Sequence, residues 1–399
     1  MPPIGRRLLL GLGYVWLAWA ILGCASTPSK PAFTPTGDLL VDGPNAIANG
    51  PPRDRVLWAY RTAAAALRKG DFALARQMLD EALLTIGGLR VNDKEARKAR
   101  GYFTGEAKKT FIGEPYERCM AYLYRGILYW MEGEPDNARA CFRSAAVIDG
   151  DTEKQEYAGD WVLAEYLDGL ATTKLAGDGS DAFKRAQAVA RGVTLPPYRR
   201  DFNVLFFFEF GPGTTKYATG EIGEQLRFRV ADSPVASAQL KINGATYPIA
   251  PTDDVFFQAT TRGGRVMDHI LGNKAVFKGT TDAVGDAALI GGLGAAAISR
   301  DRTTQQVGLG IAMAGLLSKA LSAATVPAAD TRAWDNLPRY LSFAALPLPP
   351  GRHEAIIEFK DASGQVVSTF TKVFTLNIPA DGRDKVVFVS DRSATPQTL

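Results

Sequence analysis

Residues 203–213 read NVLFFFEFGPG, and this stretch divides the chain into two kinds of sequence. A nearly continuous apolar run that ends in Gly-Pro-Gly is typical of a buried strand followed by a turn. Before it, from residue 54 to about 192, the apolar residues recur at helical spacing. After it, they alternate as they do in strands. The sequence therefore predicts a multidomain protein with an α-helical part followed by a β part.

Two stretches of the helical part align with each other around the turns Gly70-Asp71-Phe72 and Gly133-Glu134-Pro135. Each has small residues before the turn, and a large apolar residue between two small ones after it. The matching positions are Ala63, Ala66, Ala75, Leu79 and Ala82 in one copy and Gly126, Tyr129, Ala138, Phe142 and Ala145 in the other. This pattern resembles the tetratricopeptide repeat. We expect such a helical domain over residues 54–195, with a degenerate third copy near Gly177 and an insert at 87–115.

Stacked helical hairpins form concave surfaces that bind peptides or proteins, so the repeats are expected to bind a protein partner. The alternative is that they only pack on the next domain. The candidate partner-binding residues are Tyr116, Arg118, Tyr129 and Trp130. The segment Gly-Glu-Pro-Tyr-Glu-Arg is also an ordinary helix start.

Cys119 and Cys141 are expected to be free and buried. In a helical hairpin they would be offset by roughly eight residues, or ~12 Å along the axis. A disulfide requires Cα atoms within ~7 Å of each other.

The β part is predicted to be an immunoglobulin-like sandwich formed by residues 196–261 and 338–392, because short strands alternate with turns. Residues 393–399 are expected to be a disordered tail. The expected strands after residue 210 are 225–230, 236–242, 254–260, 340–346, 353–359, 365–376 and 385–389, and Asn243-Gly244 is a hairpin turn.

Residues 262–337 interrupt this sandwich and are predicted to form a Gly/Ala-rich helical hairpin. Its small residues suit close helix contacts. It could be covered by protein, enter the membrane or mediate oligomerisation. Arg262 and Arg265 flank Gly263-Gly264 and are a candidate anion-binding site, since arginine pairs with carboxylate or phosphate. A plain turn is the alternative.

The N-terminus has the organisation of a secretory signal: Arg6 and Arg7 precede an apolar run over 8–23. The sequence Ile21-Leu22-Gly23-Cys24 resembles the lipobox of bacterial lipoproteins. That resemblance implies cleavage after residue 23, lipidation of Cys24 (palmitate among the acyl chains), and, from Ala25, the outer membrane. An uncleaved anchor and an ordinary signal peptide are the alternatives. Residues 24–53, rich in Pro, Thr, Ser, Gly and Asn, are expected to be a flexible tether.

The lipobox, the paired repeats and the Gly-rich segments together resemble bacterial tetratricopeptide-repeat lipoproteins of uncharacterised function. The resemblance implies a compartment but no catalytic residues. The formal charge of +4 falls to about +2 once the signal is removed. A charge this small does not indicate a protein that binds nucleic acid. His269 and His353 are the only histidines, and no H-E-x-x-H, C-x-x-C or G-x-S-x-G motif occurs. We therefore expect no enzyme activity, cofactor or metal.

These observations predict a non-catalytic, lipid-anchored scaffold protein of the bacterial outer membrane, with its body in the periplasm. It would bind protein partners in an envelope assembly, and it could also form homo-oligomers. The alternative is an envelope hydrolase or polysaccharide-processing enzyme. Its catalytic carboxylates would leave no motif, because they need no fixed spacing in the sequence.

Overall fold

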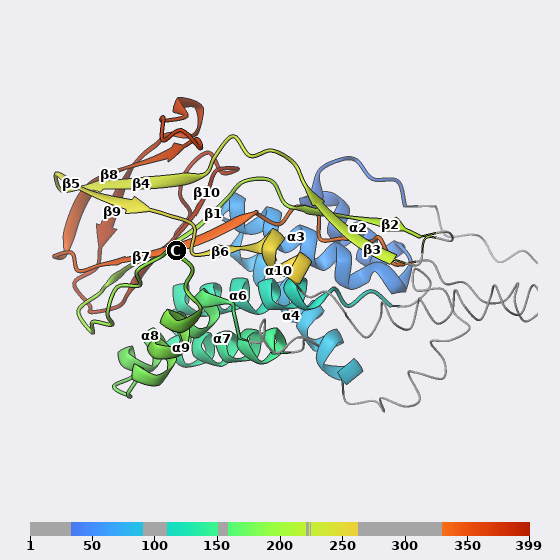
Figure 1. The fold of residues 1–399 in the computed structure, drawn as a ribbon, viewed down its shortest axis with the longest axis horizontal. Coiled ribbons are helices and arrows are strands. Elements are labelled where there is room, and N and C mark those ends of the chain that lie inside the picture. The colour runs from blue at the N-terminus through green and yellow to red at the C-terminus, as the bar shows by residue number, and fades with distance from the viewer. Residues whose placement is uncertain (1–32, 91–109, 151–158, 221–222, 224, 262–328) are drawn as a thin grey trace, which may run out of the picture.

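The computed structural model describes residues 33–90, 110–150, 159–220, 223, 225–261 and 329–399 (Figure 1). Outside these residues lie the predicted signal peptide over 1–23, Cys24, Arg262, Arg265 and most of the predicted insert over 262–337. Within them, helices occupy the N-terminal half and sheets the C-terminal half, which confirms the predicted order. None of the described helices combines the length and the apolar character needed to cross a membrane.

The described helices of the N-terminal half, called the helical unit below, include three antiparallel hairpins. Two of them turn at the predicted glycines: Gly70 and Gly133 both have positive φ, which favours a residue without a side chain. Gly126 allows close packing, because a Cβ there would lie 2.5 Å from the Phe142 ring. The helices are α2 (Leu39–Asn49), α3 (Arg55–Lys69), α4 (Phe72–Arg90), α6 (Pro115–Met131), α7 (Pro135–Asp149), α8 (Val162–Lys174) and α9 (Ser180–Val189), with a short 3-10 helix at Pro52–Asp54.

The prediction of a flexible tether over 24–53 is wrong for its C-terminal part, because Leu39–Asn49 form α2. The helix contains Gly43 and Pro44, which read as helix breakers in sequence. Gly43 is required here: a Cβ would lie 1.7 Å from Oγ1 of Thr62 on α3. The Asp38 side chain accepts a hydrogen bond from the amide of Leu40 and caps the helix.

The β half contains two four-stranded sheets and a separate hairpin. The first sheet has the order β10-β1-β7-β6, the second has the order β5-β4-β8-β9, and β2 pairs with β3. β1 is parallel to β10 and antiparallel to β7. The strands are β1 (Val204–Phe210), β2 (Thr214–Thr219), β3 (Gln225–Val230), β4 (Ser237–Ile242), β5 (Ala245–Ile249), β6 (Asp253–Asp254), β7 (Tyr340–Leu346), β8 (Gly351–Lys360), β9 (Lys372–Ile378) and β10 (Lys385–Ser390).

Three of the expected strand and tail segments in the β half differ from the structure. In the expected strand 365–376, Ser368–Phe370 form a 3-10 helix and strand β9 covers only Lys372–Ile378. Residues 254–260 were expected to be a strand, but Val255–Thr261 form the short helix α10, because the Asp254 carboxylate caps the amides of Phe256 and Phe257. Residues 393–399 were expected to be a disordered tail. Instead Gln397 pairs with Phe388 at the edge of β10, and the Ser393 hydroxyl donates to the carbonyl of Arg68.

The central strand β1 is buried along its whole length, which explains its continuous apolar sequence. Val204, Phe206, Phe208 and Phe210 point into the core between the two sheets. Leu205 and Phe207 point the other way, into the core shared with the helices. The first sheet is therefore the middle layer between the second sheet and the helical unit (Figure 1).

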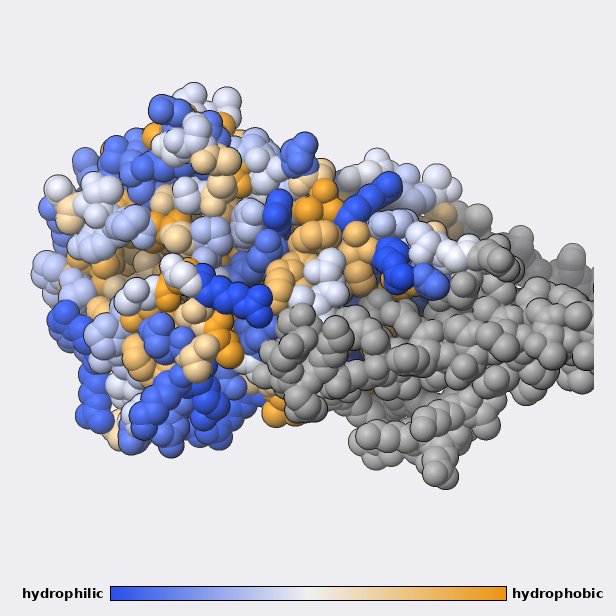
Figure 2. Space-filling model, viewed as in Figure 1, coloured by the Kyte–Doolittle hydropathy of each residue, from blue (hydrophilic) through white to orange (hydrophobic). Residues whose placement is uncertain are grey.

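The hairpins of the helical unit present their first helices to this middle layer. Contacts with strands of the first sheet come from α3, α6 and α8, whereas α4, α7 and α9 lie on the outside. Figure 2 shows mostly hydrophilic residues over the outer surface, with an apolar area around α10. The helical hairpins therefore pack on the first sheet through their first helices.

Glu209, on the helix-facing side of β1, joins the two halves by a buried charge network. Arg68 Nε lies 2.5 Å from Glu209 Oε1, and the Tyr124 hydroxyl donates to the same carboxylate. Burial alone would raise the pKa of Glu209, but the Arg68 charge and the hydrogen bonds from Arg68 and Tyr124 hold it below its ordinary value. The carboxylate therefore stays charged in the interior.

Asp253 of β6 holds the N-terminus of α8. Its two carboxylate oxygens accept the amide hydrogens of Val162 and Leu163 at 2.9 and 2.8 Å. Burial raises its pKa to about 7, against the lowering effect of these hydrogen bonds, and Asp160 and Asp254 add repulsion.

This raised pKa makes stability depend on pH. The folded protein holds a proton on Asp253 that the unfolded chain releases near pH 4, so this stabilising contribution is lost as the pH rises from about 4 to about 7. We predict that the Asp253→Asn variant lacks this decrease in stability between about pH 4 and about pH 7. Urea unfolding of both proteins at pH 5 and pH 8 measures it: the stability of the wild type relative to the variant should be greater at pH 5. An equal difference at both pH values would contradict the assignment.

Candidate binding pocket

A second buried ion pair fixes the segment 331–337 against the helical unit. Lys216 of β2 and Glu117 of α6 are 2% and 0% exposed, and Lys216 Nζ lies 2.6 Å from Glu117 Oε2. The same Oε2 accepts the amide hydrogen of Glu114 in a capping box, and Oε1 accepts the amide hydrogen of Trp334 at 2.7 Å. One carboxylate thus joins the start of α6, strand β2 and the segment before β7.

Trp334 anchors this segment by its ring as well as by its amide. The indole stacks on Tyr60 of α3 at 4.3 Å between centroids and meets Tyr124 of α6 edge-on at 5.8 Å. All three side chains are fully buried. The residues before and after Trp334 are therefore held at a fixed distance from α3.

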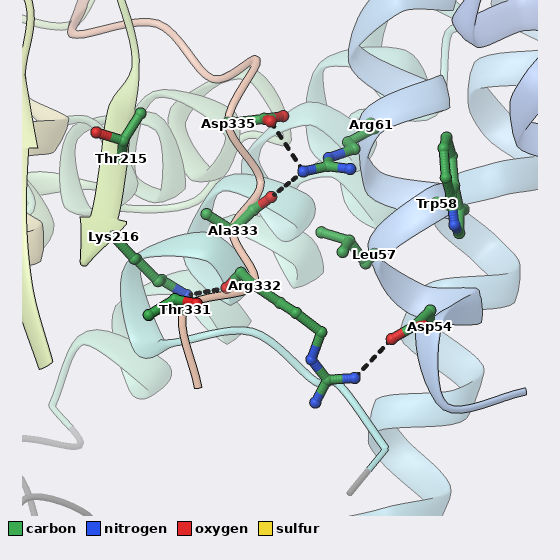
Figure 3. Close-up of a pocket in the computed structure, with 10 residues that line it drawn as sticks. All are labelled: Asp54, Leu57, Trp58, Arg61, Thr215, Lys216, Thr331, Arg332, Ala333 and Asp335. Atoms are coloured by element: carbon green, nitrogen blue, oxygen red, sulfur yellow. Dashed lines mark hydrogen bonds and ion pairs between the residues drawn. The ribbon is translucent and has the colours of Figure 1, made fainter. Parts of the chain in front are cut away.

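A pocket of about 430 Å³, called the Trp58 pocket below, lies between α3, β2 and this segment (Figure 3). Leu57, Trp58 and Arg61 of α3 line one side, after Asp54 at its start. Lys216 and Thr215 of β2 face them across the pocket. The third wall is formed by Thr331, Arg332, Ala333 and Asp335.

Both acids of the Trp58 pocket are paired with arginines from the opposite wall. Arg61 donates to Asp335 at 2.8 Å and to the carbonyl of Ala333 at 3.0 Å. Arg332 Nη1 donates to Asp54 at 2.6 Å. Burial alone would lower the pKa of Arg332, but hydrogen bonds to Asp330 and Asp54 raise it above its ordinary value. The pairs are therefore charged and hold the two walls together.

The structure does not bring the predicted partner-binding residues to a surface. Tyr116 and Trp130 are each 1% exposed, Arg118 is also buried, and Tyr129 is half-buried beneath Arg125. The Trp130 indole donates to Asp384 near β10. Tyr116 meets Phe228 of β3 edge-on. The prediction of an open binding face is therefore wrong for Tyr116, Arg118 and Trp130, because contacts with other parts of the chain bury them.

The two cysteines are as expected from the hairpin geometry. Among the residues that the structure describes, neither Cys119 nor Cys141 forms a disulfide, and both are buried. Burial raises the pKa of the Cys141 thiol to about 12, and the Cys119 thiol donates to the carbonyl of Ala145.

The Trp58 pocket corresponds to no continuous pattern in the sequence, because its walls come from three distant parts of the chain. The only local signal was Trp58 and Arg61, which are one helical turn apart on α3. In the described part of the chain, no group of three or more His, Cys, Asp or Glu side chains is placed to hold a metal ion.

Comparisons with protein-family models, with curated proteins and with solved structures returned no match to this chain.

We predict that Glu117→Gln destabilises the protein by ~3–5 kcal/mol, because it leaves the buried Lys216 charge without its counterion. Chemical unfolding measures the loss. The double variant Glu117→Gln/Lys216→Met should recover part of it, since the unpaired charge is then absent.

Glu81→Gln is the matched control, because Glu81 pairs with Arg55 at a partly exposed position. Its expected cost is below ~1 kcal/mol. A Glu117→Gln variant as stable as this control would contradict the role given to the buried pair.

Proposed function

We propose that the protein is a non-catalytic, lipid-anchored scaffold of the bacterial cell envelope, attached through Cys24 to the outer membrane with its body in the periplasm. The apolar run that ends at Cys24 supports the anchor. The helical hairpins with glycine turns support tetratricopeptide-like repeats, and the two facing sheets support an immunoglobulin-like sandwich.

The pairing of acids and arginines in the Trp58 pocket is the observation that favours a binding role over a catalytic one. Asp54 and Asp335 are each engaged by a guanidinium group. Such pairs offer hydrogen-bond donors and acceptors to a ligand. A general acid or base instead requires a carboxyl group within hydrogen-bond reach of the proton that it transfers, and here both carboxylates are engaged by arginines. The arrangement therefore favours binding.

The outer helices are the surface we assign to a protein partner, because the first helices are covered by the sheet. Leu84 of α4 and Val147 of α7 are 77% and 71% exposed. These two positions lie on the helices that do not pack on the sheet, so a partner can reach them.

The alternative, an envelope hydrolase, has one observation in its favour: the pKa values of Asp253 and Asp160 are raised by burial. However, both oxygens of Asp253 accept backbone amides, and Asp160 accepts a hydrogen bond from Gln258. Both residues are buried. We therefore assign these acids to the capping of α8 and the fixation of α10.

Photo-crosslinking in living cells tests the scaffold proposal. A photoreactive residue at Leu84 or Val147, with the native anchor intact, should give a discrete crosslinked species, and mass spectrometry should identify an envelope protein in it. Val373 of β9 is 71% exposed and is the matched control on the opposite side of the molecule.

The control position should give no such species. Crosslinks from Val373 alone, or none from the outer helices, would contradict the assignment. Cys24→Ser should release the protein from the membrane fraction; if the variant stays there as the wild type does, lipidation of Cys24 is not the anchor.

A further inference from the structure

We propose that the Trp58 pocket binds a neutral saccharide. This goes beyond the scaffold function, since a protein partner on the outer helices and a small ligand in this pocket are independent of each other. The pocket has about 430 Å³, within the ~300–1,000 Å³ of typical small-molecule sites. Its walls are held in place by the Trp334 stack and by the ion pair between Lys216 and Glu117.

The charges of the pocket indicate a ligand without net charge. Arg61 is paired with Asp335, and Lys216 is paired with the buried Glu117. Arg332 is paired with both Asp54 and Asp330. A phosphate or carboxylate ligand would compete with Asp335 or Asp54 for the guanidinium groups and would be repelled by these carboxylates. A neutral ligand can bind with every pair intact.

The same pairs match the hydroxyl groups of a sugar. A hydroxyl both donates and accepts hydrogen bonds. In each pair of the pocket, a guanidinium that can only donate lies beside a carboxylate that can only accept, at 2.8 Å for Arg61 and 2.6 Å for Arg332. Neighbouring hydroxyls on one sugar ring can therefore use both members of a pair, and charged partners make such hydrogen bonds stronger.

The apolar part of the wall completes this match. Trp58 is half-buried at the pocket, with the Phe33 ring edge-on at 5.3 Å and the Arg61 guanidinium 5.7 Å from its centroid. Figure 3 shows Leu57 and Trp58 on the same side, across from Thr215. The C–H face of a sugar ring can pack on this apolar side, while its hydroxyls meet the paired charges. An aromatic side chain supplies large contact area at low entropic cost.

Calorimetric titration of the full-length protein, in a detergent whose headgroup is not a sugar, tests the proposal. The probes are N,N′-diacetylchitobiose as a neutral disaccharide, digalacturonate as an acidic one, and a neutral tripeptide. The wild type should bind the neutral disaccharide in preference to the other two. Preference for digalacturonate or the tripeptide, or no binding of the neutral disaccharide, overturns the proposal.

Two variants locate the binding. Trp58→Ala should lower the affinity for the neutral disaccharide about tenfold, because the contact with the indole ring is lost. Asp335→Asn frees the Arg61 charge at an exposed position, so the protein should shift its preference toward digalacturonate. Asp201→Asn, which breaks the exposed pair with Arg199 elsewhere, is the matched control and should leave affinities unchanged. Equal affinities in the wild type and both pocket variants overturn the proposal.

Discussion

The burial of strand β1 on both faces is the constraint on which the rest of the structure depends. One face of β1 supplies the core between the two sheets, and the other supplies the core shared with the helices. Glu209 lies on the second face with its charge satisfied by Arg68 and Tyr124. Any arrangement that separates the helices from the sheet would expose the apolar side chains of this second face, Leu205 and Phe207 among them, to water and would break the pair between Arg68 and Glu209. The helical unit and the sheets are therefore parts of one body.

The Trp58 pocket is a consequence of this attachment. Its walls belong to α3, to β2 and to the segment before β7, so it exists only where the helical unit meets the β half. Glu117 connects two of these walls, and Trp334 is packed against the third. The first helices of the hairpins are used for the same contact. A surface that repeat proteins often offer to partners is here occupied by the chain's own sheet.

Local patterns allowed much of the fold to be predicted, but not the contacts between its parts. The turns at Gly70 and Gly133 and the run at 203–210 were recognised, since glycine and continuous apolar sequence act locally. α2 was missed because only its packing on Thr62 explains Gly43. The burial of Tyr116 and Trp130 and the Trp58 pocket could not be predicted, because both depend on residues far away in sequence.

Native-state hydrogen exchange, measured by mass spectrometry at increasing urea concentrations, tests most directly whether the chain is one body organised around β1. The account predicts that amides of α6, β1 and β8 reach exchange through the same global opening, with one free energy and one urea dependence. If α6 exchanged through a separate opening of lower free energy while β1 and β8 stayed protected, the helical unit would be an independent domain and the account would be wrong.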